Sequence, residues 1–163
     1  SKMTLFKNQT LRKYLDQLSS RDPVPGGGSA AALVGATGVS LICMVARYSQ
    51  NRHKGKAVER KISDHFRKAE KIRKRLITLV DLDAQAYLAV VKISKSDKVR
   101  RKKALKKAQA APLEVCRLCY AAIQFIPFLV KNGNPYLLSD AECAAEMLLA
   151  AFRSALANVK ANQ

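Results

Sequence analysis

The sequence predicts an all-α protein, a multi-helix bundle of five or six helices that includes one long helix. Apolar side chains recur at the three- and four-residue spacing of amphipathic helices, and no segment shows the alternation typical of a strand. Seven glycines and five prolines among 163 residues are also few for a loop-rich chain. This length suits one substantial core, so residues 1–163 are expected to form a single helical domain.

Three helices are predicted in the first half of the chain. The first covers about residues 10–18, where leucine and tyrosine recur at helical spacing. The second covers about residues 29–49, with Ser29 as a natural N-cap, and carries no charge up to Ala46. Its many alanines and glycines predict close packing against several neighbours. The third begins after Gly55 and meets no helix breaker before Ser94, so it is the long helix and is expected to reach about forty residues.

The second half continues as helices separated by two clear signals. A basic helix begins near Lys98 and runs towards Pro112, which should kink it or restart it. An apolar helix then covers residues 113–130, and the loop 131–135 follows. Ser139 and Glu142 have the spacing of a capping box, with the serine as N-cap of the final helix.

The stretch between the first two helices, PVPGGGS at residues 23–29, is the most unusual motif. Its glycines expose backbone N–H groups at the start of a buried helix, an arrangement that can bind an anion or a carbonyl oxygen. The alternative is a tight turn that merely starts a core helix. A dinucleotide-binding fingerprint is excluded because no strand precedes the glycines. A phosphate-binding P-loop is excluded because Ala30 and Ala31 stand where Lys and Ser or Thr are required.

Asp83 lies in the apolar stripe of the long helix. Its neighbours three and four residues away are Leu79, Val80, Ala86 and Tyr87, all largely apolar. Asp81, two residues earlier, is expected on a more polar face. A carboxylate in an apolar seam is costly unless it is paired or hydrogen-bonded, so Asp83 is either a buried polar contact or an acid–base group with a raised pKa.

The charge is strongly basic, with a formal value of +18 at pH 7. Residues 52–75 and 92–107 carry most of it. An anionic partner is therefore plausible, whether a polyanionic small molecule, a nucleic acid or a membrane surface, although solvated helix faces explain such stretches equally well.

The four cysteines lie in apolar helical surroundings, which is typical of reduced thiols in a cytoplasmic protein. Cys116 and Cys119 have metal-like spacing, but no second pair or histidine accompanies them, so no metal site is predicted.

The order of these landmarks resembles the cyclodeaminase/cyclohydrolase family, which comprises formimidoyltetrahydrofolate cyclodeaminase domains and methenyltetrahydrofolate cyclohydrolases. The resemblance extends from about Leu11 to Asn162, and PGGGS at a helix start is its most specific motif. The other matching motifs, in order, are Met44-Val45-Ala46, Asp83-Ala84-x-Ala86-Tyr87, Ala111-Pro112-Leu113, Gly133-Asn134, Ser139-Asp140 and Asn158-Val159-x-x-Asn162.

The resemblance implies an all-α, typically homodimeric enzyme acting on one-carbon tetrahydrofolates, with Asp83 as the catalytic aspartate. It implies that the substrate contacts include the following residues: Gly26, Gly27, Gly28, Ser29, Asn134 and Asp140. Asn158 and Asn162 match the terminal motif and are interpreted as buried scaffold. No metal or cofactor is implied, and the basic side chains would attract the folate's glutamate tail, with or without further glutamates.

Asp83 would activate water against methenyltetrahydrofolate, or shuttle a proton to the departing nitrogen of formimidoyltetrahydrofolate. The sequence leaves both reactions open. The alternative is a non-catalytic basic binding protein for nucleic acid or another polyanion, although the basic stretches contain only one aromatic residue, Phe66, for base stacking. A third possibility is an adaptor that uses the fold only to dimerise.

Overall fold

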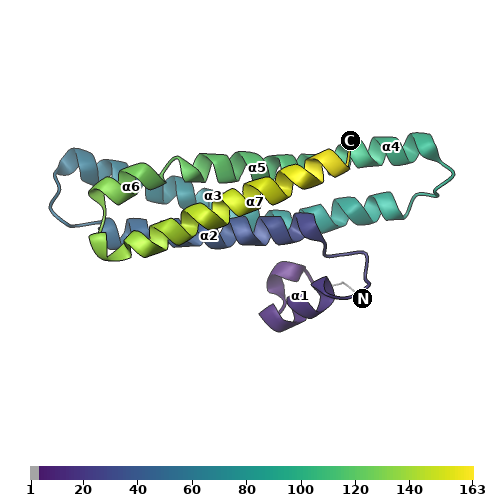
Figure 1. Ribbon diagram of the computed structural model, residues 1–163, viewed down its shortest axis with the longest axis horizontal. Helices are drawn as coiled ribbons and strands as arrows, with labels where there is room; N and C mark the ends of the chain where they lie inside the picture. The colour runs from purple at the N-terminus through teal and green to yellow at the C-terminus, as the bar shows by residue number, and fades with distance from the viewer. Residues whose placement is uncertain (1–3) are drawn as a thin grey trace.

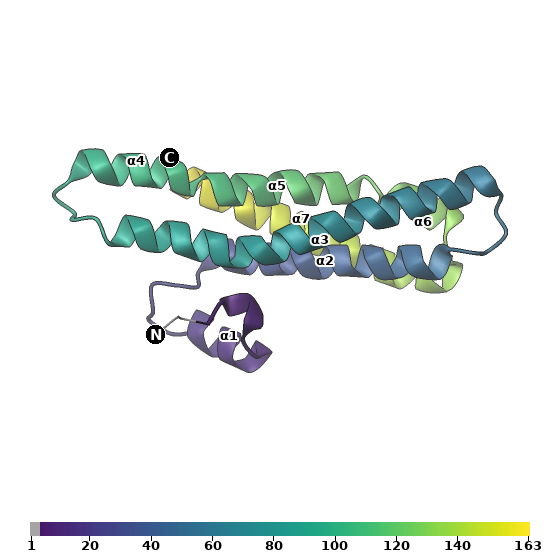
Figure 2. The same cartoon turned by 180° about the vertical axis from the view of Figure 1, so that it is seen from behind.

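The protein is an elongated bundle of helices (Figures 1 and 2), seen in a computed structural model that describes residues 4–163. The described part contains no strand. The elements in order are the 3-10 helix η1 (Phe6–Asn8), α1 (Leu11–Leu18), α2 (Gly27–Ser49), α3 (Lys56–Val91), α4 (Lys98–Ala108), α5 (Ala110–Ile123), α6 (Ile126–Asn132), the 3-10 helix η2 (Pro135–Leu137) and α7 (Leu138–Ala161). Because α4, α5 and α6 follow one another as one rod over Lys98–Asn132, residues 4–163 form five helical rods, α1 included, and the predicted fold class is confirmed.

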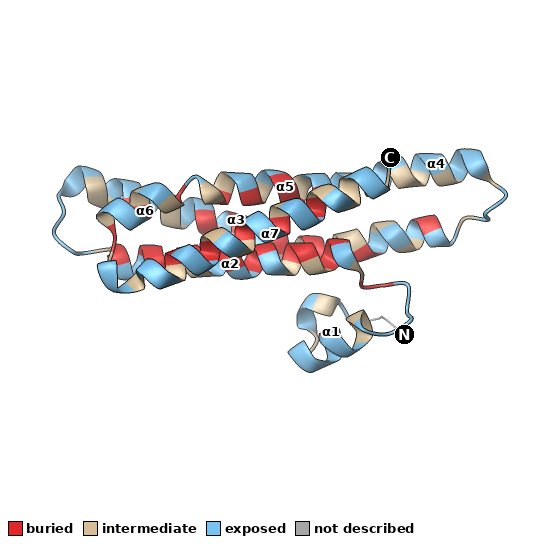
Figure 3. Ribbon diagram, viewed as in Figure 1, coloured by how far each residue is buried: buried red, intermediate tan, exposed pale blue. Residues whose placement is uncertain are grey.

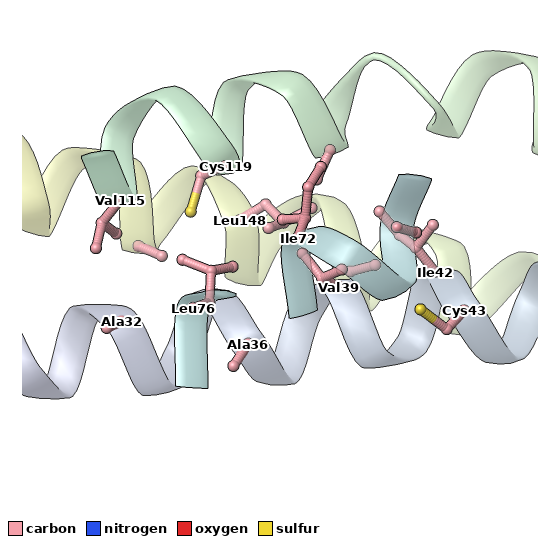
Figure 4. Close-up of a cluster of buried hydrophobic side chains, with 14 of the residues drawn as sticks. Ala32, Ala36, Val39, Ile42, Cys43, Ile72, Leu76, Val115, Cys119 and Leu148 are labelled. Carbon is pink, nitrogen blue, oxygen red and sulfur yellow. The ribbon is translucent and has the colours of Figure 1, made fainter. Parts of the chain in front are cut away.

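The helix α2, which carries no charge up to Ala46, is the centre of the bundle and packs against α3, α5 and α7 (Figure 4). Its glycines allow this close approach: a methyl group at Gly38 would lie 3.0 Å from Leu148, and one at Gly35 would lie 3.0 Å from the Cys119 sulfur. Its length and composition would also let it cross a membrane, but most of it is buried inside the bundle, as expected for a core helix. The prediction of several packing partners is therefore confirmed.

The two predicted serine caps are wrong. α2 begins at Gly27 with Gly26 as N-cap, so Ser29 is the third residue of the helix and lies in its first turn. α7 begins at Leu138, one residue before Ser139, and no side chain caps it. In both places the preceding residues already have helix-compatible backbone, so each helix starts earlier than the serine.

The interruption predicted at Pro112 is confirmed, with a small displacement. The helix is interrupted at Gln109, between α4 and α5, and Pro112 lies in the first turn of α5. A proline is tolerated there because the first amides of a helix have no intrahelical acceptor. This interruption separates the basic helix α4 from the apolar helix α5.

The helix α1 stands away from the bundle, beneath α2 in Figure 1, and most of it is exposed (Figure 3). Tyr14 is its single buried residue, whereas Leu11 is 78% exposed and Leu15 is 57% exposed. The segment is held by Asp81 of α3, whose carboxylate accepts hydrogen bonds from the amides of Phe6 at 2.7 Å and Lys7 at 3.2 Å. Asp81 is only 6% exposed, so the expectation of a more polar face was wrong.

Candidate active site

A cavity of about 310 Å³ lies where the N-terminus of α2, the second half of α3 and the C-terminus of α7 meet. Asp83 of α3 is its only acidic or basic residue among the described residues. The lining residues are Pro23, Val24, Gly26, Gly27, Gly28, Asp83, Tyr87, Ala108, Asn158, Ala161 and Asn162. The cavity therefore combines one carboxyl group with a helix start and two asparagine side chains.

A larger cavity of about 530 Å³ lies between η1, α1 and α3 and shares the wall formed by Pro23 and Val24. Its buried carboxylate, Asp81, already accepts two backbone hydrogen bonds. The smaller cavity is the better candidate for chemistry, because no other described side chain forms a hydrogen bond with Asp83 there, and Asp83 faces the amides of a helix start.

Burial raises the pKa of Asp83 to about 6, and a hydrogen bond from the backbone amide of Ser29 partly opposes this effect. Desolvation disfavours the charged form, and within residues 4–163 no cationic side chain contributes a compensating effect. A carboxyl group with this pKa can both accept and donate a proton near neutral pH, as acid–base catalysis requires. The prediction that Asp83 is a carboxyl group with a raised pKa is thus supported by its surroundings.

The glycines of the motif leave room for this carboxyl group. A methyl group at Gly28 would overlap with both oxygens of the Asp83 carboxylate. One at Gly27 would lie 3.6 Å from the Asn158 amide, and one at Gly26 would meet nothing within 4 Å. Gly28 is therefore the position at which the absence of a side chain is needed, and Gly26 and Gly27 keep the cavity open.

Ser29 contributes its backbone and not its side chain. Its hydroxyl group is fully buried and shares a 2.8 Å hydrogen bond with the hydroxyl group of Tyr14. The side chain therefore faces α1, whereas the amide faces Asp83.

Asn158 and Asn162 line the cavity, contrary to the expectation that they are buried scaffold. The Asn158 side chain donates a hydrogen bond to the Ser154 carbonyl at 2.9 Å, which leaves its amide oxygen free to accept. The sequence contained a signal for this role, because Ser154, Asn158 and Asn162 form a polar ladder on an otherwise apolar helix. Tyr87, which is 45% exposed, was matched to the family but given no role.

Asn134 and Asp140 lie at the opposite end of the bundle. The amide of Asn134 donates to the Ser49 hydroxyl at 3.0 Å, at the C-terminal end of α2, and Asp140 lies in the first turn of α7. Gly28 and Ser49 are separated by nearly the whole of α2, about 30 Å at 1.5 Å per residue. Within one chain, therefore, these two predicted contacts and Asp83 do not share a cavity.

Comparison with known proteins agrees with the resemblance seen in the sequence. The profile of the formiminotransferase-cyclodeaminase family matches residues 10–163. A methenyltetrahydrofolate cyclohydrolase of Methylorubrum extorquens is 34% identical, over 95% of this chain and 79% of the relative. A rat formimidoyltransferase-cyclodeaminase is 30% identical over 94% of this chain, which spans only 30% of that longer protein.

A solved structure shows the same fold. The formiminotetrahydrofolate cyclodeaminase of Thermotoga maritima superposes with a TM-score of 0.90 and 30% sequence identity, over 96% of this chain and 79% of that one. The profile match, the identity to the cyclohydrolase and the shared fold lead to one conclusion: the chain belongs to the formiminotransferase-cyclodeaminase family.

Proposed function

We propose that the protein is a one-carbon folate enzyme that hydrolyses methenyltetrahydrofolate or cyclodeaminates formimidoyltetrahydrofolate, with Asp83 as general acid and base. The observation that carries the proposal is the half-buried Asp83 carboxyl group, with a pKa of about 6, against the bare backbone of Gly28. The relatives named for these two reactions support the substrate class.

In the hydrolytic reaction the electrophile is the carbon that bridges two nitrogens of methenyltetrahydrofolate. Water attacks this carbon, and the Asp83 carboxylate takes the proton that the water loses. The bond from the carbon to one nitrogen then breaks, and Asp83 returns its proton to that nitrogen. The hydroxyl proton leaves to solvent, and a formyl group remains on the other nitrogen.

In the cyclodeaminating reaction a second nitrogen of the folate attacks the formimidoyl carbon, and the bond from this carbon to the imino nitrogen breaks. Asp83 passes two protons to the departing nitrogen, the first from the attacking nitrogen and the second from solvent, so that ammonia leaves. In either reaction, the backbone N–H groups at the start of α2 and the amides of Asn158 and Asn162 are suited to hold the pterin's polar atoms.

The basic helix α4 is suited to attract the glutamate tail of the folate, with or without further glutamates. Ala108, at the end of α4, lines the cavity, and Lys106 and Lys107 are exposed in the last turn of this helix. Asp97 is the single acidic residue of the stretch 92–107, and it pairs with Arg100. The lysines are therefore left to interact with an anionic tail at the mouth of the cavity.

The same exposed charge favours a second candidate, a non-catalytic protein that binds nucleic acid or another polyanion. Binding of this kind would weaken steeply with salt and would not compete with folate. A folate-competed, weakly salt-dependent affinity would instead support the enzyme.

We also propose that the working form is a homodimer. The face of α2 that the bundle leaves uncovered carries no charge over residues 30–46, in a chain with a formal charge of +18. Val34 on this face is 39% exposed. An uncharged face is the surface on which two strongly basic copies can meet with the least repulsion. A solution mass of one chain at micromolar concentration would contradict the dimer.

The test of the enzyme is an absorbance assay of methenyltetrahydrofolate decay, corrected for spontaneous hydrolysis, beside an assay of ammonia release from formimidoyltetrahydrofolate. Asp83→Asn preserves the shape and removes the proton acceptor, so turnover should fall roughly 10²–10⁴-fold. The control is Asp16→Asn on the exposed face of α1, which should leave turnover unchanged. Equal turnover in wild type and Asp83→Asn would show that the assignment is wrong.

The stability of Asp83→Asn provides an independent measurement on the same variant. Because burial raises the pKa of Asp83 from 3.8 to about 6, the folded chain holds this proton more tightly than the unfolded chain. The resulting stabilisation is complete below pH 3.8 and is lost as the pH rises through 6. At pH 8 the free energy of unfolding of the variant should therefore exceed that of wild type by up to about 3 kcal/mol. At pH 4 the two values should differ little. If the ionised carboxylate instead stabilised the fold, the variant would be less stable than wild type at pH 8.

A further inference from the structure

We propose that the N-terminal segment from Phe6 to Tyr14 is a positioning arm, in which Tyr14 holds Ser29 and thereby fixes the backbone amide that faces the Asp83 carboxylate. The effect of the arm on catalysis rests on the proposed function, in which Asp83 is the acid–base group. It assigns a role to Tyr14 and to Asp81 that the reaction itself does not require.

The contacts form a closed path that begins and ends on α3. The Asp81 carboxylate accepts the amide hydrogen of Phe6 at 2.7 Å. The Phe6 ring packs edge-on against the Tyr14 ring, with 5.9 Å between the ring centroids. The Tyr14 and Ser29 hydroxyl groups share a hydrogen bond of 2.8 Å. Gly28, the residue before Ser29, lies so close to the Asp83 carboxylate that a methyl group there would overlap with both oxygens, and the Ser29 amide faces the same carboxylate. Two carboxylates two residues apart on one helix are thus joined through the arm and the start of α2.

The arm is attached at few points: Tyr14 belongs to the hydrophobic core, and Phe6 and Leu18 pack against it, whereas most of α1 is exposed. Tyr14 is 4% exposed and is the one residue of α1 that the bundle buries. Its apolar neighbours Leu11 and Leu15 are largely exposed. Breaking a hydrogen bond between two buried hydroxyl groups is costly, because neither group can form a replacement hydrogen bond with water. The Tyr14–Ser29 hydrogen bond therefore ties the position of the arm to the start of α2.

The arm can act on Asp83 through geometry without touching the substrate. Tyr14 is absent from the lining of the Asp83 cavity, and the Ser29 side chain faces away from it. The other groups that face this carboxyl group are the Tyr87 side chain, the Asn158 and Asn162 amides and the glycine backbone. Loosening Ser29 removes the hydrogen bond that favours the ionised carboxylate, so the pKa of Asp83 should rise further.

The experiment compares Tyr14→Phe, Ser29→Ala and the double variant. The readouts are kcat/KM per folded molecule and the pKa of Asp83, measured by carbon-13 NMR of the aspartate carboxyl carbons and assigned with Asp83→Asn. We expect each single variant to raise this pKa and to lower kcat/KM about tenfold, the loss of one hydrogen bond. The double variant should lose no more than either single variant, because both remove the same contact.

Leu15→Ala is the control on the same helix, since its side chain is 57% exposed, and it should change neither readout. If Tyr14→Phe fails to fold, Ser29→Ala tests the same contact from the other side. An unchanged Asp83 pKa in the folded single variants, or additive losses in the double variant, would overturn the proposal. The NMR readout does not need turnover, so a wild type inactive on both folates would refute the proposed function and still leave the arm tested.

Discussion

The two ends of α2 use the same kinds of residue in opposite ways. At its N-terminus, Gly28 leaves room for the Asp83 carboxyl group, which has no side-chain partner in the part of the chain that the structure describes. At its C-terminus, Gly133 packs against the Leu129 carbonyl and the Ser49 hydroxyl, where a methyl group would overlap with both. The Ser49 hydroxyl donates to the Val45 carbonyl at 2.6 Å and accepts the Asn134 amide at 3.0 Å.

The difference is one of satisfied and unsatisfied polar groups. At the far end, Asn134 also accepts the Tyr136 amide at 3.0 Å and donates to the Tyr48 carbonyl, so it holds a loop in place. At the near end, a carboxyl group and two asparagine side chains surround an open cavity. Polar groups that are fully paired stabilise a joint, whereas buried groups left partly unpaired are available to a substrate.

Among substitutions at the two ends of α2, Gly28→Ala is expected to have the largest effect, a loss of turnover. The new methyl group must displace the Asp83 carboxyl group, which is the end of a side chain and can move. A displacement of about 1 Å can lower turnover roughly 10²-fold, so activity should fall while the melting temperature changes little. Unchanged turnover would show that Asp83 does not need its present position.

Gly133→Ala should produce the opposite pattern. Its methyl group would meet the Leu129 backbone carbonyl, which cannot rotate away. Overpacking of this kind costs about 1–3 kcal/mol in free energy of unfolding, which denaturant titration measures. Turnover per folded molecule should remain that of wild type, and a selective loss of turnover would place the far end in the chemistry.

The smallest effect is expected from Asp140→Asn. Asp140 lies in the first turn of α7, at the same end of the bundle as Asn134, and its charge interacts with the helix dipole. Removing that charge should cost about 0.3–1 kcal/mol of stability and leave turnover unchanged. A fall in turnover would indicate that a second copy brings this end of the bundle to the cavity.

The contrast also shows which parts of the molecule could be predicted from sequence. The helical period and the long breaker-free stretch from Lys56 predicted the bundle, because they are local properties of the chain. Asp83 was identifiable because its neighbours on one helix are apolar. Asp81 was misjudged because its partners, the amides of Phe6 and Lys7, come from a distant segment.

The asparagines show the same limit of local reasoning. The ladder on α7 was visible in the sequence, but only the fold places Asn158 and Asn162 opposite the glycines. Asn134 lies just before α7 in the sequence, but the fold places it against Ser49, at the opposite end of the bundle from Asn158 and Asn162. Whether a side chain lines a cavity depends on which helix ends meet in the fold. Asn134 lies at the start of α7 and Asn158 and Asn162 lie at its end, so the length of this helix separates them.

The most direct test of the central claim is the pH dependence of kcat/KM, which reports the ionisation of the free enzyme. If ionised Asp83 is the base in cyclohydrolysis, kcat/KM should rise with pH and level off above about 6, the pKa that burial gives this group. If its protonated form is the acid in cyclodeamination, kcat/KM should fall above about 6 instead. The residual activity of Asp83→Asn should lack this transition. A wild-type transition near pH 6 that persists in Asp83→Asn, or no transition in the wild type, would contradict the assignment of Asp83 as the acid–base group.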